Sequence, residues 1–483
     1  MSSMRQRLDT TRDGEIVRYR GKAVAMVSYH IVHQCTKYKR FRRGMCRIGS
    51  DAVIWSAGRS NRWGRVEERY GWAVPREGRY GAARAVLLIL AGMLAGQAVA
   101  GEKRYGPGVS DTEIRIGNTS PYSGPASAFS MVAKTEEAYF RKVNAEGGIN
   151  GRRIVFLSYD DAYSPPKTVE QTRRLVESDE VLLVFNALGT AANSAVQKYL
   201  NARKVPQLFV SSGAAKWNDP KNFPWTIGFT PSYETEGFIY AKYVLQQRPD
   251  AKVAILFQND DLGKDYLKGI KQGLGDRAAS MIVAEEAFDV SEPTIDSHLV
   301  KLRSTGADVL FDIATPKFAA QAIKKVSELG WKPLHILSYV SASIGSVIKP
   351  AGFENAQGLI SAAYFKDPND PAWKGDAGLK ELNEFLDRYF PGADRSDRLI
   401  VNGYNTAQAL VYLLKQCGDD LTRENVMRHA ANLKQVELGM LLPGIRLNTS
   451  PVDFAPVKQW QLMRFEGTNW HLFGDVMSGA AGN

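Results

Sequence analysis

The sequence has little cysteine and few features that could replace a hydrophobic core. Cys35, Cys46 and Cys417 are the only cysteines in 483 residues, and Cys417 alone follows residue 100. A disulfide framework is therefore excluded for the main part of the chain. A length of 483 residues with 44% hydrophobic content is enough for two or three domains with cores of their own. Cys417 follows a helix-like stretch, where we expect a surface position.

Net charge is also scarce outside the first residues. The whole chain carries +11, but residues 1–84 hold 19 Lys and Arg against 7 Asp and Glu. Residues 85–483 then hold 43 basic against 44 acidic side chains, a net charge of −1. Because nucleic-acid binding needs a basic surface, the main part of the chain offers no charge-based case for it. We expect no nucleic-acid partner.

A single long apolar run breaks this pattern at residues 85–100, AVLLILAGMLAGQAVA. It follows Arg76, Arg79 and Arg84 and ends on small residues, which is typical of a secretory signal with an n-region at about 74–84. A membrane-spanning helix needs about 20 apolar residues, so an uncleaved anchor is the weaker alternative. The pattern predicts cleavage after Ala100 and export to the periplasm. No cysteine follows, which argues against a lipid anchor.

Residues 1–84 precede this signal and form a basic upstream extension rich in Arg, Gly and Trp. A signal peptide belongs at the N-terminus of a chain, so we expect translation to start near Val74 and residues 1–84 to be untranslated or disordered. The alternative is a genuine basic tail that contacts RNA or lipid.

Motifs for catalysis and metal binding are missing from the sequence beyond the signal. His298, His335, His429 and His471 are far apart and have no metal-ligand spacing. The chain has no GxSxG, no P-loop and no GxGxxG after the first strand. Cys417 has no histidine nearby in sequence. These absences predict a protein that is not an enzyme and that holds no metal and no cofactor.

What the sequence does contain is a regular alternation of strand-like and helix-like segments. Alternation of this kind predicts an α/β fold with parallel sheets covered by helices on both faces. The predicted strands are 113–118, 154–159, 181–186, 207–211, 253–258, 281–287, 309–313 and 334–338. The predicted helices are 129–145, 167–177, 191–202, 234–247, 264–274, 295–304, 317–329, 380–389, 402–415 and 423–431.

Half of the strands precede Phe229-Thr230-Pro231-Ser232 and half follow it, which indicates a crossing between two doubly wound lobes. The last segment, 457–473, alternates aromatic residues around Glu466-Gly467-Thr468-Asn469 and predicts a β-hairpin. We expect residues 112–231 plus about 365–455 to form one lobe, and 232–364 plus about 456–477 the other. Two lobes joined by several hinge crossings make a cleft, and ligands bind at the carboxyl ends of its strands.

Three predicted strand ends carry small and hydroxyl-bearing residues: SPYSGPASAF at 120–129, ALGTAAN at 187–193 and SSGAAKW at 211–217. Small residues let a ligand approach the backbone, and free N–H groups near helix starts favour an anion such as a carboxylate. Such residues also suit ordinary turns. Asp160-Asp161, at the end of the second strand, is expected to orient its loop rather than to bind the ligand.

SGPASAF, NAEGGINGRRI and SYDDAYSPPKTVEQTRRLV, together with QNDDLGKDYLKG at 258–269, resemble the leucine/isoleucine/valine-binding family of periplasmic solute receptors for ABC transporters. The likeness covers about residues 112–475. It implies a type I periplasmic binding protein, a Venus flytrap whose two lobes close on a small solute and deliver it to a membrane permease.

The resemblance also implies roles for single residues. Phe129 contacts the ligand side chain, Thr190 holds the charged head, and the backbone at Gly213 and Ala214 faces the carboxylate. Ser211 and Ser212 stand beside them at the same strand end and are expected to bind the polar head of the ligand as well. Ala215 lies where amino-acid binders often carry Thr or Ser, which puts an α-amino-acid ligand in doubt.

In the second lobe, the resemblance implies an apolar contact from Leu262, where Tyr is frequent, and an acidic partner for a ligand ammonium at Glu292. The predicted ligand is a branched-chain or related amino acid. The alternative is a non-amino carboxylate such as an aromatic acid, which a position of Glu292 away from the cleft would favour. A ligand-sensing receptor domain is the alternative from another class.

Overall fold

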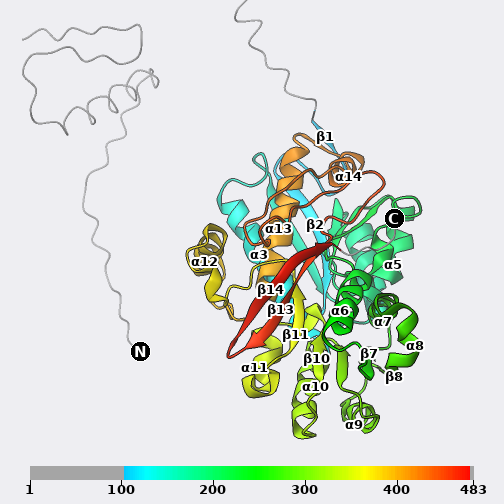
Figure 1. The fold of residues 1–483 in the computed structure, drawn as a ribbon. Coiled ribbons are helices and arrows are strands. Elements are labelled where there is room, and N and C mark those ends of the chain that lie inside the picture. Colours follow the sequence, from blue (N-terminus) through cyan, green and yellow to red (C-terminus); the bar gives the residue numbers. More distant parts are fainter. Residues whose placement is uncertain (1–102, 479–483) are drawn as a thin grey trace, which may run out of the picture. The chain divides into compact units, whose positions relative to one another are not determined.

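The computed structural model describes residues 103–478 (Figure 1). The predicted signal at 85–100 and the basic extension at 1–84 lie outside the described residues. Among residues 103–478, the helices are all too short or too polar to cross a bilayer.

The first sheet is parallel throughout, as the alternating pattern predicts. In spatial order its strands are β3 (Arg153–Asp160), β2 (Glu113–Ser120), β4 (Leu183–Phe185), β5 (Gln207–Val210) and β6 (Thr226–Gly228). The central strand β4 is buried along its whole length, as expected for a strand covered by helices on both faces.

The helices that pack with the first sheet come from two distant parts of the sequence. The first group is α3 (Ser130–Ala145), α4 (Pro165–Arg173) and α5 (Thr190–Ala202). The second group is α12 (Ala377–Tyr389), α13 (Leu399–Gln416) and α14 (Arg423–Ala430). Helices α12 and α13 pack on α3, so the chain returns to the first lobe after building the second. Two-residue strands β1 (Arg104–Tyr105) and β12 (Asp420–Leu421) pair beside them.

The second sheet has a parallel core with an antiparallel hairpin at one edge. Its spatial order is β14 (Asn469–Ser478), β13 (Gln459–Glu466), β11 (Ile360–Ala363), β10 (Leu334–Leu337), β9 (Val309–Ile313), β7 (Val253–Gln258) and β8 (Ile282–Phe288). Strand β8 lies at the other edge and alternates exposed with less exposed residues. The hairpin predicted at 457–473 is confirmed as β13 and β14, which are red in Figure 1.

The helices of the second lobe follow the same alternation. They are α6 (Tyr233–Gln247), α7 (Asp261–Leu274), α8 (Ala278–Met281), α9 (Asp296–Ser304), α10 (Pro316–Glu328) and α11 (Lys349–Ala351). Helices α6 and α7 form the most extensive helix pair of the described chain. The prediction of an α/β fold with two doubly wound lobes is confirmed. The residue numbers proposed for the lobe boundaries stay a prediction.

The surface position predicted for Cys417 is wrong. Cys417 follows α13 directly and is buried, 5% exposed, rather than at the surface as the sequence suggested. The end of α13 packs inward here, and burial raises the pKa of the Cys417 thiol to about 12. A thiol with so high a pKa is not a nucleophile at neutral pH.

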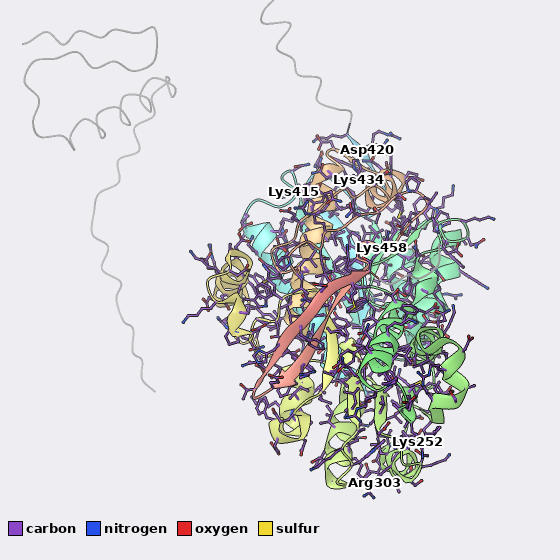
Figure 2. The ribbon with its side chains drawn as sticks, in the orientation of Figure 1. Lys252, Arg303, Lys415, Asp420, Lys434 and Lys458 are labelled. Carbon is purple, nitrogen blue, oxygen red and sulfur yellow. The ribbon has the colours of Figure 1, made fainter. Side chains whose placement is uncertain are left out.

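Charged side chains of both signs, such as Lys415 and Asp420, stand at the same end of the drawn structure (Figure 2).

Candidate functional site

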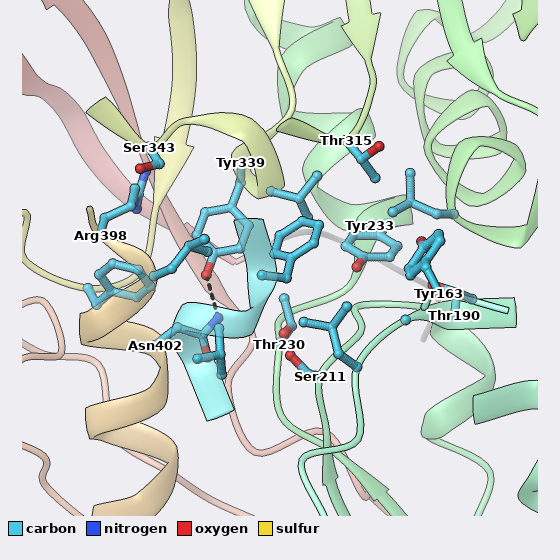
Figure 3. A pocket seen from close by; sticks show the side chains of 18 residues that line it. Tyr163, Thr190, Ser211, Thr230, Tyr233, Thr315, Tyr339, Ser343, Arg398 and Asn402 are labelled. Atoms are coloured by element: carbon cyan, nitrogen blue, oxygen red, sulfur yellow. Dashed lines mark hydrogen bonds between the residues drawn. The ribbon is translucent and has the colours of Figure 1, made fainter. Parts of the chain in front are cut away.

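One pocket is lined by the carboxyl ends of strands from both sheets. From the first lobe come the segments after β2, β3, β4, β5 and β6, and from the second lobe those after β7, β9, β10 and β11. The start of α13 closes one wall. The lining residues are Phe129, Val132, Tyr163, Leu188, Gly189, Thr190, Ser211, Thr230, Tyr233, Leu262, Thr315, Tyr339, Val340, Ser343, Phe365, Arg398, Leu399 and Asn402 (Figure 3).

Local backbone geometry shapes the first-lobe wall. Phe209 has φ 55°, in the left-handed region that aromatic residues avoid, at a register shift between β5 and β6. This irregularity directly precedes Ser211, a lining residue. Gly189 has φ 102° and caps α5, and a Cβ there would lie 2.8 Å from the Tyr163 ring. Only glycine therefore allows the β4 loop to approach Tyr163 this closely.

The pocket is largely apolar. Phe129, Val132, Leu188, Leu262 and other aliphatic or aromatic side chains form most of its surface. The empty space between the lining atoms measures about 590 Å³ including its opening. Because side chains of both lobes line this one space, the arrangement is that expected of a closed form.

Neutral hydroxyl and amide groups supply most of the polar lining. Burial raises the pKa of the Tyr163, Tyr233 and Tyr339 phenols above the ordinary value, so all three are protonated at neutral pH. Asn402 donates to the Tyr339 hydroxyl at 3.3 Å, the bond drawn in Figure 3. Thr190 Oγ1 lies 2.7 Å from Ser212 Oγ.

Arg398 supplies the positive charge of the pocket, and no acidic residue is among the pocket-lining residues of the described chain. Arg398 is 2% exposed and directly precedes α13. Its guanidinium carbon lies 5.0 Å from the ring centre of Tyr339 and 4.6 Å from that of Phe365. Figure 3 shows it on the same wall as Ser343.

The predicted site residues divide between this pocket and its surroundings. Phe129, Thr190, Ser211 and Leu262 line the pocket. Ser212 is buried behind it and is hydrogen-bonded to Thr190. These placements describe geometry, and the ligand contacts of these residues stay predictions.

Gly213 and Ala214 line a neighbouring cavity instead, formed with residues 228–235 and 453–458, where the chain passes between the two sheets. A Cβ on Gly213 would lie 2.4 Å from the Pro231 carbonyl oxygen and 2.7 Å from the Tyr233 ring. Close packing against the first crossing thus gives Gly213 a structural role of its own. Thr230 lines both cavities and connects them.

Glu292 is not among the residues that line the inner pocket. It borders an outer cavity with Tyr163 and Pro316, and it belongs to a surface cluster. Its carboxylate accepts from the Asp289 N–H at 2.7 Å and lies 3.0 Å from His298 Nε2. These bonds hold the pKa of Glu292 below its ordinary value. Its expected role as an ammonium partner stays a prediction.

Asp160 and Asp161 orient the loop after β3, as the sequence predicts. Asp160 accepts from the Ser123 hydroxyl at 2.6 Å and from the Ala162 N–H at 2.9 Å. Asp161 accepts from the Thr168 hydroxyl at 2.8 Å and from the Tyr163 N–H at 3.0 Å. The pair therefore positions Tyr163 against the pocket without lining it.

Direct polar contacts join the lobes beside the pocket. Lys216, in the turn η3 (Ala215–Trp217) after β5, pairs with Asp261 at the start of α7 at 2.5 Å. The Ala215 N–H donates to Asp265 at 3.1 Å, and burial raises the pKa of Asp265 to about 6. These contacts stabilise the closed arrangement.

Sequence reasoning missed Tyr163, Tyr233, Tyr339, Arg398 and Asn402. Tyr339 directly follows a predicted strand and Tyr163 lies four residues after the end of another, so the rule that ligands meet strand ends could have found them. Arg398 and Asn402 lie at the start of a helix far along the chain. The sole sign of a functional role in the sequence was that the charged Arg398 directly precedes an apolar 18-residue helix. In the described part of the chain, no three His, Cys, Asp or Glu side chains gather as a metal site would need.

A sequence model of the periplasmic binding protein family matches residues 113–469, and the chain belongs to this family. The predicted resemblance to the leucine/isoleucine/valine-binding receptors is thereby confirmed. Among curated proteins, the chain is 22% identical over 369 residues to the Leu/Ile/Val-binding protein homolog 7 of Brucella suis biovar 1 (strain 1330). That alignment covers 74% of this chain and 88% of the relative.

Solved structures show the same fold. A branched-chain amino acid ABC transporter protein from Thermus thermophilus with bound valine matches with a TM-score of 0.69 and 17% identity, over 77% of this chain and 98% of that one. An ABC transporter solute binding protein from R. palustris in complex with benzoate matches with a TM-score of 0.64 and 17% identity, over 77% and 98%.

Proposed function

We propose that this protein is the substrate-binding component of an ABC transporter, exported to the periplasm by a cleaved signal peptide. It closes its two lobes on a small carboxylate with an apolar body and delivers that solute to a membrane permease. It acts by binding, without catalysis and without a cofactor. The observation that carries the proposal is one apolar pocket at the strand ends of both lobes, in a member of the periplasmic binding protein family.

The mechanism is a shift in population. A solute that touches only one lobe does not favour either form, whereas a solute that touches Phe129 and Thr190 in one lobe and Leu262 and Tyr339 in the other stabilises the closed form. The open form admits the solute, and the closed form presents a defined surface to the permease.

Two classes of ligand fit the pocket, and its lining residues favour one of them. An α-amino acid carries an ammonium group that needs an acidic or carbonyl partner, and no acidic side chain is among the described residues that line the pocket. A non-amino carboxylate such as an aromatic acid therefore ranks first. A branched-chain amino acid is the second candidate, which the aliphatic side chains of Val132, Leu188 and Leu262 favour.

Thermal unfolding of the purified protein with valine, leucine, benzoate and benzamide tests this ranking. A ligand that binds only the folded state, at 100 times its dissociation constant, stabilises the protein by about 2.7 kcal/mol. We expect benzoate to raise Tm by several degrees and benzamide to leave it unchanged. A shift with valine or leucine alone would establish the second candidate, and no shift with any of the four would contradict the carboxylate class.

A further inference from the structure

Arg398 is a buried cation without a partner of opposite charge. It is among the largest fully buried side chains of residues 103–478, yet none of the ion pairs found there includes it. Its Nη1 has one weak contact, 3.8 Å from the Met463 sulfur, and its Nε and Nη2 have no hydrogen-bond partner among the described residues. A guanidinium has five N–H donors, and burying them unsatisfied is costly.

The acidic groups around Arg398 make their hydrogen bonds with other residues. Asp397 accepts from the Leu399 N–H at 3.0 Å and from the Ser343 hydroxyl at 2.8 Å. Glu236 accepts hydrogen bonds from two tyrosine hydroxyls and one backbone N–H. Asp367 accepts from Asn369 through one oxygen, and its other oxygen has no partner. Burial raises the pKa of all three carboxyl groups, although the charge of Arg398 lowers it, and none of the three forms an ion pair with Arg398 in the described structure.

The position of Arg398 connects this unsatisfied charge to the pocket. Arg398 lines the pocket. The guanidinium packs against the rings of Tyr339 and Phe365, which line the pocket as well. A planar carboxylate accepts two parallel N–H bonds from a guanidinium, a geometry that a lysine ammonium cannot reproduce.

We propose that Arg398 is the anchor for the carboxylate of the transported solute and selects anions that lack an ammonium group. The proposal rests on the proposed function and names the residue that recognises the substrate class. The carboxylate meets Nε and Nη2, and the apolar body extends along Phe129, Leu188 and Leu262. Binding neutralises a buried charge, so part of the affinity comes from relieving the instability of the empty protein.

The test compares two buried arginines. Arg398→Met removes the guanidinium and keeps an unbranched side chain of similar reach. Arg398→Lys keeps the positive charge and removes the two parallel N–H donors of the guanidinium. Arg152→Met is the matched control, because Arg152 is also 2% exposed but pairs with Asp419 at 2.7 Å and with the Tyr105 hydroxyl at 2.6 Å. All proteins are unfolded in guanidinium and refolded to remove any bound solute.

The first readout is the Tm without added solute. We expect Arg398→Met to raise Tm by about 1–3 °C, because it removes an unsatisfied buried charge, and Arg152→Met to lower it, because it leaves Asp419 without its partner. A fall in Tm for Arg398→Met like that for Arg152→Met would overturn the proposal, because it would show that Arg398 serves neighbours such as Asp367 structurally.

The second readout is calorimetric titration with benzoate and benzamide. We expect benzoate affinity to fall about 30-fold or more in Arg398→Met and to recover only partly in Arg398→Lys, with Arg152→Met unchanged. Equal benzoate affinity in wild type and Arg398→Met would overturn the anchor while leaving the transport function intact. If neither benzoate nor valine binds the wild type, the proposed function fails instead, and the Tm comparison still decides the state of Arg398.

Discussion

Glu236 is fully buried on α6, where its carboxylate accepts from the hydroxyls of Tyr240 at 2.6 Å and Tyr266 at 2.7 Å and from the Tyr339 N–H at 2.8 Å. Through that last bond it positions a residue that lines the pocket. Burial raises the pKa of Glu236 to about 7, from an ordinary value of 4.5. The folded protein therefore binds this proton more tightly than the unfolded chain does.

The sign of the pH dependence follows from this shift. Its contribution to stability is fully present below pH 4.5 and is lost as the pH rises through 7. Glu236→Gln resembles the protonated acid and cannot titrate. We expect the free energy of unfolding of the wild type to fall relative to Glu236→Gln by on the order of 2–3 kcal/mol between pH 5 and pH 8. Urea unfolding at several pH values measures this, and a constant difference between the two proteins would contradict it.

At the scale of elements, the alternation of apolar runs and helical stretches located the strands and helices well, because parallel strands are buried on both faces and give continuous apolar segments. Strands β6 and β11 were missed, since they have only 3 and 4 residues and lack a run long enough to recognise. Helix α4 begins at Pro165, two residues before the predicted start at 167, and the Ser164 side chain before it makes no capping hydrogen bond.

The contact between η3 and α7 joins the lobes and is suited to a test at this scale. Lys216 and Asp261 are 41% and 43% exposed, so solvent screens their attraction. We expect Lys216→Met to weaken benzoate binding only about two- to fivefold, less at high salt, because the pair exists only when the lobes are closed. Titrations at low and high salt measure this change.

Lys268→Met is the matched control for that contact. Lys268 lies on α7 and pairs with Glu234 of α6 at 2.8 Å, so both residues of this pair belong to the second lobe. We expect no change in benzoate affinity for this variant. If both variants weaken benzoate binding equally, the change in Lys216→Met comes from the loss of a positive charge and not from the loss of a contact between the lobes.

At the scale of the whole molecule, folding brings together residues that are far apart in sequence. The loops that carry Phe129 and Thr190 were located at predicted strand ends of the first lobe, and the family resemblance singled out the two residues. Arg398 reaches the same pocket only because α13 returns to pack on α3 after the second lobe is complete. That return is a tertiary feature with no local signal, which is why the charged residue that we propose as the carboxylate anchor could not be found from the sequence.

The enclosure of the pocket by both lobes leads to the last expectation. Side chains of both lobes line it, and Lys216 pairs with Asp261 beside it, so we expect the lobes to separate before a solute enters. The empty protein therefore spends part of its time open, and a solute that contacts both lobes shifts it toward the closed form.

We expect the radius of gyration from small-angle X-ray scattering to fall when saturating benzoate is added to refolded, solute-free protein. Arg152→Met should show the same decrease, because its ion pair lies outside the pocket, and Arg398→Met should show a smaller one at a concentration that only just saturates the wild type. An unchanged radius in the wild type, at a benzoate concentration that calorimetry shows to be saturating, would mean that the solute enters without lobe movement and would contradict the closure mechanism.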